Sequence, residues 1–134
     1  MREEIDFKTA KNLKSIGFIG VFNGKRSTPM FNYKGEVVFE KGGYEGVYDP
    51  KERIGFYLIS DYDFVQNWLT ENYNVNIKIV LTPEKMFEGY IQYFDNNKRF
   101  KEVFETYSTT YYKVKKKAVK AAIKLIKEKK LTQI

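Results

Sequence analysis

The segment at residues 110–130 constrains the fold more than any other part of this sequence. At about 100° per residue its apolar side chains gather on one side of an α-helix, with lysines opposite. The apolar side comprises Val114, Ala118, Ala121, Ala122, Leu125 and Ile126, widened by Val119 and Ile123. A stripe of this kind must be covered by another element, and its alanines predict a close approach to that element.

The preceding residues predict a sheet that can cover this helix. In residues 75–82, Val75, Ile77, Ile79 and Leu81 alternate with Asn76, Lys78, Val80 and Thr82, which indicates a strand with one buried face. Residues 87–94 and 98–107 predict a hairpin around Asp95-Asn96-Asn97. Residues 62–73 carry an apolar stripe at helical spacing. Residues 61–130 therefore predict the order α-β-β-β-α.

The first 60 residues predict a helix followed by short strands. Asp6 can cap a helix over residues 7–16, which Gly17 ends. Strands are expected at 18–22, at Phe31 and Tyr33, and at 36–41, with a turn at Asn23-Gly24. They suggest an antiparallel meander. Residues 42–50 predict a loop, and 54–59 either a strand or an extended link.

These patterns predict the α+β class, with an antiparallel sheet and helices packed on one of its faces. At 134 residues, one domain is expected over 1–134. It would contain a helix and β-meander at 1–60 and an α-β-β-β-α unit at 61–134. No apolar run approaches the ~20 residues of a membrane span, and the charged N-terminus has no apolar signal core. We therefore expect no membrane association and a cytoplasmic location.

Cysteine and histidine are both absent from the sequence. Their absence excludes a Ser-His-Asp triad, a thiolate nucleophile, and zinc sites built on thiolate or imidazole. Asp61 and Asp63 form the only close aspartate pair, and we interpret them as helix-capping residues. The best catalytic candidates left are Glu102 and Glu105 with a lysine or tyrosine partner. We expect no enzymatic activity, no cofactor and no metal site.

Positive charge is concentrated at the C-terminal end. The chain has a net charge of +7, whereas residues 111–134 hold nine lysines and one glutamate, or +8, and residues 1–110 carry −1. Such asymmetry suggests a segment that contacts an anionic partner. The alternative is a solvated helix face that keeps the protein soluble. The candidate contact residues are Lys113, Lys116, Lys117, Lys120, Lys124 and Lys127, with Tyr111 and Tyr112.

Exposed tyrosines are a second candidate feature. Tyrosine is favoured at protein interfaces and stacks on unpaired bases. Besides Tyr111 and Tyr112, the tyrosines expected in loops or near the ends of elements are Tyr44, Tyr48 and Tyr57. The alternative is that most of these rings pack in or beside the core.

The order α-β-β-β-α, ending in a helix with Lys115-Lys116-Lys117-Ala118 and Lys120-Ala121-Ala122, resembles the double-stranded-RNA-binding domain. In that family, lysines at the start of the last helix bind phosphates across the major groove. The resemblance implies RNA contact by these lysines. The alanine spacing differs by one residue, and the family's Gly-Pro and His loop has no counterpart around residues 83–89.

Local motifs resemble short uncharacterised proteins of bacterial phages and prophages. The matching residues are Leu13-Lys14, Gly17-Phe18, Phe64, Trp68-Leu69, Glu71, Asn74, Ile77, Ile79, Thr106-Tyr107 and Ala121–Ile126. Proteins of that group usually have an acidic last helix, so the lysine-rich helix suggests a partner surface specific to this member. A small phage protein with a charged face and no catalytic set is similar to the anti-CRISPR inhibitors. Those inhibitors often bind the nucleic-acid channel or the guide RNA of an effector.

The sequence thus suggests a non-enzymatic, phage-type inhibitor that disables a nucleic-acid-handling host defence complex. It would bind the effector protein or its RNA through the lysine-rich helix. Two other functions remain open: a stand-alone RNA- or DNA-binding module, and a phage structural or oligomeric interaction protein. The oligomeric state does not follow from the sequence.

Overall fold

The computed structural model describes residues 4–18, 27–41, 57–58 and 61–134. Chain contacts divide it into two compact units, an N-terminal unit that ends at Asp61 and a C-terminal unit at Tyr62–Ile134. The division lies after Asp61, whereas the two parts expected from the sequence meet between residues 60 and 61, and the single domain stays a prediction. Helices and antiparallel sheets in separate segments confirm the α+β class. Within the described residues, no helix is long and apolar enough to cross a bilayer.

The N-terminal unit begins with helix α1 (Phe7–Ser15), close to the predicted span. The side chain of Asp6 accepts a hydrogen bond of 2.8 Å from the backbone N–H of Thr9, which caps the helix start as predicted. Leu13 is fully buried. Gly17 follows the helix with a φ of 95°, a conformation that glycine adopts without steric cost.

Three short strands form the N-terminal sheet: β1 (Ser27–Phe31), β2 (Val37–Lys41) and β3 (Tyr57–Leu58). The sheet is antiparallel with the order β2-β1-β3, so β1 is central, which differs from the consecutive order of a meander. Tyr33 lies in the β1–β2 turn and not in a strand as expected, because the turn begins at Asn32. Phe18 also lies outside any strand, and the rest of the strand expected at 18–22 and the turn at 23–24 fall outside the described residues.

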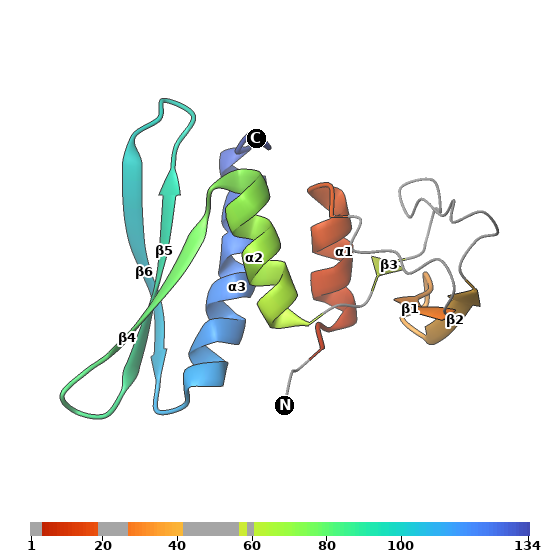
Figure 1. Cartoon of the computed structure of the whole chain (residues 1–134), viewed down its shortest axis with the longest axis horizontal. Coiled ribbons are helices and arrows are strands. Elements are labelled where there is room, and N and C mark those ends of the chain that lie inside the picture. The colour runs from red at the N-terminus through yellow and green to blue at the C-terminus, as the bar shows by residue number, and fades with distance from the viewer. Residues whose placement is uncertain (1–3, 19–26, 42–56, 59–60) are drawn as a thin grey trace. The chain divides into compact units, whose positions relative to one another are not determined.

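The C-terminal unit has the predicted order α-β-β-β-α. Helix α2 (Tyr62–Tyr73) leads into strands β4 (Asn76–Leu81), β5 (Phe87–Phe94) and β6 (Phe100–Ser108), followed by helix α3 (Tyr111–Lys129). The sheet order is β4-β5-β6, all antiparallel. Both helices of this unit lie on the same side of its sheet, and α3 crosses all three strands (Figure 1). The predicted packing of helices on one sheet face is thus confirmed for this unit.

The apolar side of α3 packs tightly against the middle strand, as its alanines predict. Val114, Ala118 and Ala122 are fully buried. A Cβ atom built on Gly89 of β5 would lie 2.6 Å from Cγ1 of Val114 and 3.6 Å from Cβ of Ala118. Residue 89 therefore has to be glycine for the helix to approach the sheet this closely.

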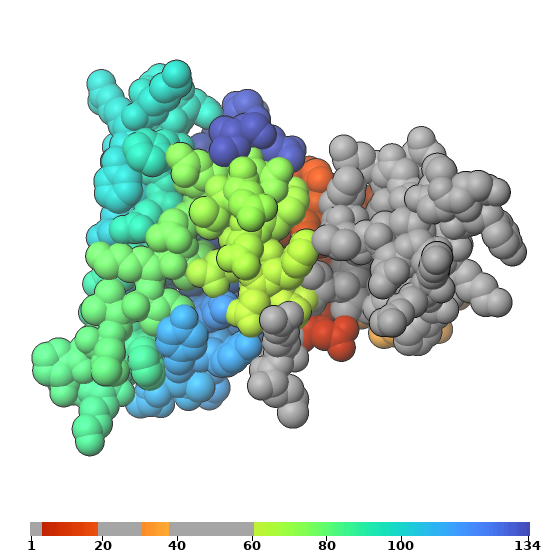
Figure 2. All heavy atoms as spheres, viewed as in Figure 1, coloured from red at the N-terminus to blue at the C-terminus, as the bar shows by residue number. Residues whose placement is uncertain are grey.

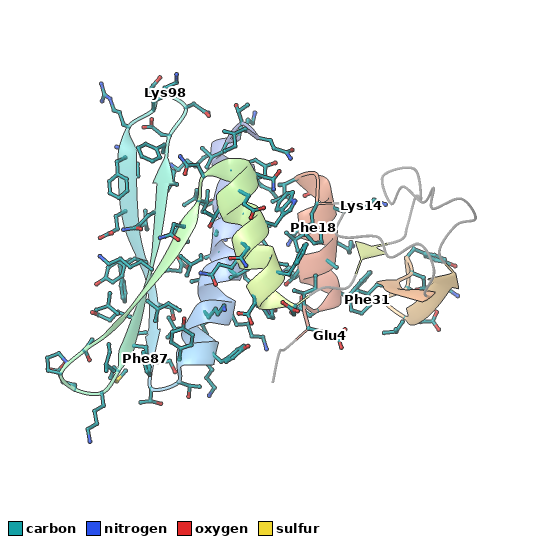
Figure 3. All side chains as sticks on the ribbon, in the orientation of Figure 1. Glu4, Lys14, Phe18, Phe31, Phe87 and Lys98 are labelled. Atoms are coloured by element: carbon teal, nitrogen blue, oxygen red, sulfur yellow. The ribbon has the colours of Figure 1, made fainter. Side chains whose placement is uncertain are left out.

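Three hairpin turns share one geometry, which fixes the strand ends. Each begins with a polar residue whose carbonyl accepts a hydrogen bond from the N–H three residues later, at a residue with positive φ. The first and fourth residues of these turns are Asn32 and Gly35, Thr82 and Lys85, and Asp95 and Lys98. This pattern is typical of a type I turn followed by a left-handed residue. Lys98 lies at the tip of the β5–β6 turn (Figure 3).

Candidate functional site

The lysine face of α3, defined as Lys113, Lys116, Lys117, Lys120, Lys124 and Lys127, lies opposite the buried side of the helix. Lys113, Lys117, Lys124 and Lys127 are exposed, whereas Lys116 and Lys120 are half-buried. Lys116, Lys120 and Lys127 each interact with other groups of the protein. The ammonium group of Lys116 lies 5.9 Å from the ring centroid of Tyr62. The four exposed lysines therefore form its most accessible part.

Little negative charge offsets this exposed part. Lys124 lies 3.8 Å from the carboxylate of Glu128 one turn further on, and both side chains are mainly exposed. Exposed pairs of this kind contribute little to stability. Among the described residues, the structure records no ion pair for Lys113 or Lys117. Neighbouring lysines on one helix face repel each other weakly, and an anionic partner would relieve that repulsion.

Lys115 differs from its neighbours because it points inward. It is buried, and its ammonium group forms an ion pair and hydrogen bond with the carboxylate of Asp63. The same ammonium lies 5.9 Å from the ring centroid of Tyr112. The pair joins α3 to α2. The first turns of α3 lie beside α2 in Figure 2. Lys115 is therefore a structural residue and not part of the cluster that the RNA-binding-domain resemblance implies.

The sequence predicts Asp63 as a helix cap, and its pair with Lys115 is seen only in the structure. Asp63 instead lies inside the first turn of α2, where the positive end of the helix dipole also favours a carboxylate. A sequence signal does exist, because residue 115 falls outside the arc of the lysine face and on the same side of the helix as apolar Val119 and Ala122. A lysine at such a position needs a partner when it is buried.

The candidate tyrosines fall into different environments. Tyr111 is 46% exposed, and its ring contacts Phe87 edge-on with centroids 5.6 Å apart. Phe87 begins β5 and lies near the start of α3 (Figure 3). Tyr112 is half-buried. Tyr44 and Tyr48, and the side chain of Tyr57, fall outside the described residues. Tyr111 thus lies on the side of α3 that faces the sheet and not on the lysine face. Tyr112 packs beside the ammonium group of Lys115.

The outer face of the C-terminal sheet, turned away from α3, carries exposed aromatic side chains that the sequence analysis did not single out. The rings form edge contacts at 5.6 Å for Tyr90 with Phe104 and 5.7 Å for Phe94 with Phe100. Phe104 also stacks on Tyr107 at 6.4 Å. In the sequence, Phe100, Phe104 and Tyr107 are separated by charged residues. This pattern does not show which face of the sheet is left uncovered.

Polar groups cross the same face between the rings. Asn76 donates to Gln92 at 2.8 Å, and Gln92 donates to Glu102 at 2.7 Å. The ammonium group of Lys78 lies 3.5 Å from the carboxylate of Glu102. Desolvation raises the pKa of Tyr90, and the negative charge of Glu88 and its hydrogen bond with the Tyr90 hydroxyl act in the same direction. The side chains of this face are therefore held in place by one another.

The catalytic candidates Glu102 and Glu105 occupy different settings on β6. Glu102 belongs to the polar row just described. Glu105 is exposed and lies at an irregularity of the β5–β6 ladder opposite Gly89 and Tyr90. Within the part of the chain that the structure describes, no group of three or more acidic residues could hold a metal ion.

Comparison with protein families, with curated proteins and with solved structures finds no match for this chain. The lysine face and the outer face of the sheet are therefore the features from which a function can be inferred.

Proposed function

We propose that this chain is a non-enzymatic binding protein whose lysine face attaches to an anionic surface of a nucleic-acid-handling host complex and inhibits that complex. One observation carries the proposal: Lys113, Lys117, Lys124 and Lys127 are exposed along α3, while the opposite side of the helix is buried against the sheet. The host-complex part is supported by the resemblance to phage and prophage proteins.

The chemistry of lysine favours contact with a charged backbone over recognition of particular bases. An ammonium group is a point charge without the planar fork with which arginine pairs to a guanine edge. A row of lysines along a straight helix therefore suits phosphates, or a row of carboxylates, at any sequence. The partner would be selected by its charge and shape.

The test compares two variants with the same change in net charge. In the first, Lys113, Lys117 and Lys124 are replaced by glutamate. In the matched control, glutamate replaces three exposed lysines on other elements, Lys8, Lys34 and Lys85. A tagged protein is used to capture partners from host cells, with and without nuclease. We expect the first variant to lose the captured complex and the control to keep it.

Equal capture by the two variants would contradict the proposal, because binding would then follow net charge or another surface. Loss of capture after nuclease treatment would show that RNA or DNA belongs to the contact. A titration of naked RNA and DNA over a range of salt concentrations distinguishes a stand-alone nucleic-acid-binding module from a protein that binds only the host complex. That module predicts a log–log salt slope that changes by about 0.7–0.9 per phosphate contact.

A further inference from the structure

Strand β6 forms an outer edge of the C-terminal sheet and leaves much apolar surface open. The order β4-β5-β6 places it at the edge of the sheet (Figure 1). Among the described residues, no strand pairs with the backbone edge of β6 that points away from β5. Phe100 is 56% exposed, Phe104 49% and Val103 38%. An edge strand of nine residues also presents a row of backbone N–H and C=O groups that another strand can bind.

Exposed apolar groups occur on both faces of this edge. Val103 pairs in register with buried Ile91 and so belongs to the face that α3 covers, whereas Phe104 pairs with Tyr90 on the outer face. The ring contacts to β5 hold Phe100 and Phe104 along the edge. An added strand would cover apolar surface on both faces at once, which a ligand on one face alone would not.

The charges on β6 favour a second copy of the same strand as the occupant. Lys101 precedes Val103 by two residues, and Glu105 follows it by two. In an antiparallel pair with a twofold axis at Val103, Lys101 of each copy lies opposite Glu105 of the partner subunit. Opposite charges in such cross-strand positions stabilise a sheet, whereas like charges destabilise it.

Other positions of the twofold axis fit the charges less well. An axis at Lys101, Glu102 or Glu105 would place two like charges directly opposite each other. An axis at Phe104 would pair Lys101 with Tyr107 and Val103 with Glu105, so no charge would be matched. The irregularity opposite Gly89 and Tyr90 lies at Glu105, which limits the regular pairing to Lys101–Glu105.

We propose that β6 pairs antiparallel with β6 of a second copy of this chain, with Lys101 opposite Glu105 in both directions. The two three-stranded sheets would then form one continuous sheet. Because a twofold axis perpendicular to a sheet leaves its faces unchanged, both α3 helices would lie on the same side. Their lysine faces would be presented together. This inference does not depend on the proposed function.

The experiment measures the mass of the full chain in solution by light scattering and sedimentation over a dilution series. We expect the native protein to be a dimer. Lys101→Glu replaces both attractive pairs by Glu–Glu pairs, and Glu105→Lys replaces them by Lys–Lys pairs. Each variant should raise the dimer dissociation constant about tenfold or more. Lys85→Glu, which changes the same charge in the β4–β5 turn, should leave it unchanged.

Two further samples test the register. The double variant Lys101→Glu/Glu105→Lys should dimerise again, and an equimolar mixture of the two single variants should form a heterodimer. Circular dichroism of each variant checks that the chain is folded. A native protein that stays monomeric at every concentration would overturn the proposal. So would a dimer that neither single variant weakens, or a double variant without rescue.

Discussion

The two sides of helix α3 have opposite surroundings. On the inner side, Val114 and Ala118 are fully buried against the sheet, and Val114 leaves no space for a larger residue at position 89. On the outer side, Lys113 and Lys117 are exposed. Stability and binding are therefore separable in this helix. Substitutions on the inner side should unfold the protein, whereas those on the outer side should leave it folded and change what it binds.

The largest effect is expected at Gly89, where the sheet meets the inner side. Gly89→Ala brings a Cβ within 2.6 Å of Cγ1 of Val114, whose β-branched side chain is fully buried and cannot move aside. We expect the free energy of unfolding in urea to fall by about 2–3 kcal/mol. Adding Val114→Ala removes the clashing methyl group. The double variant should therefore lose less than the two single losses combined, and strict additivity would disprove the clash.

A smaller effect is expected at the Lys115–Asp63 pair, which joins α3 to α2. Asp63→Ala leaves the buried ammonium of Lys115 without its carboxylate. Because the Asp63 side chain is 34% exposed, we expect a loss of about 1–2 kcal/mol in the free energy of unfolding, less than for a fully buried pair. Glu71→Ala, an exposed change on the same helix, is the control. Equal stability of the two variants would show that the pair is dispensable.

Asp95 tests whether a half-buried residue in a hairpin turn contributes to the fold. Its carboxylate accepts hydrogen bonds of 2.9 Å from the backbone N–H groups of Arg99 and Asn97. Its pKa is lowered, chiefly by the bond from Arg99, with further contributions from the bond from Asn97 and from nearby positive charges, while desolvation acts in the opposite direction. The stabilisation is thus present above the unfolded-state pKa of about 3.9 and is lost as the pH falls through the lower folded-state value.

In the N-terminal unit, the neutral amide of Asn32 makes the corresponding hydrogen bonds in its hairpin turn. Its Oδ1 accepts from the backbone N–H groups of Lys34 and Glu36. Asp95→Asn should therefore keep the turn and remove part of the loss of stability in acid. Asn32→Asp should introduce such a loss. Thermal unfolding between neutral pH and about pH 2 measures both, since this range spans the carboxyl pKa. Identical acid profiles for the native chain and both variants would contradict this account.

The smallest effect on stability is expected on the outer side. Replacing Lys113, Lys117 and Lys124 by glutamate should change the free energy of unfolding by less than about 0.5 kcal/mol per site, because these side chains are exposed. The same variant should lose the anionic partner. A large loss of stability would contradict the claim that stability and binding are separable in α3, because the lysines would then contribute to the fold.

Much of the C-terminal unit could be predicted because its periodicities are long and unbroken. The alternation in residues 75–82 and the two-faced pattern in 110–130 fixed the elements within two or three residues, and the buried alanines followed from the same pattern. The N-terminal sheet could not be ordered, since Ser27–Phe31 shows no alternation and strand pairing there depends on contacts distant in sequence.

The surfaces could be predicted only in part. The lysine face follows from helical spacing, but the inward position of Lys115 depends on Asp63, 52 residues away. The aromatic face of the sheet has the composition of a core strand, because Phe and Tyr favour strands whether or not the second face is covered. No local pattern says that the chain provides α3 for one face of this sheet and, among its described residues, nothing for the other.

The Lys115–Asp63 contact also has an evolutionary consequence. Among relatives of this chain, positions 63 and 115 should mutate in concert, to another oppositely charged pair or to two apolar residues, since a lone buried charge is costly. Positions 113, 117 and 124 are not constrained by a buried charge, and their residues should vary with the surface of the partner. Covariation between 63 and 115 in an alignment would thus distinguish descendants of this fold from chains that merely have a lysine-rich last helix.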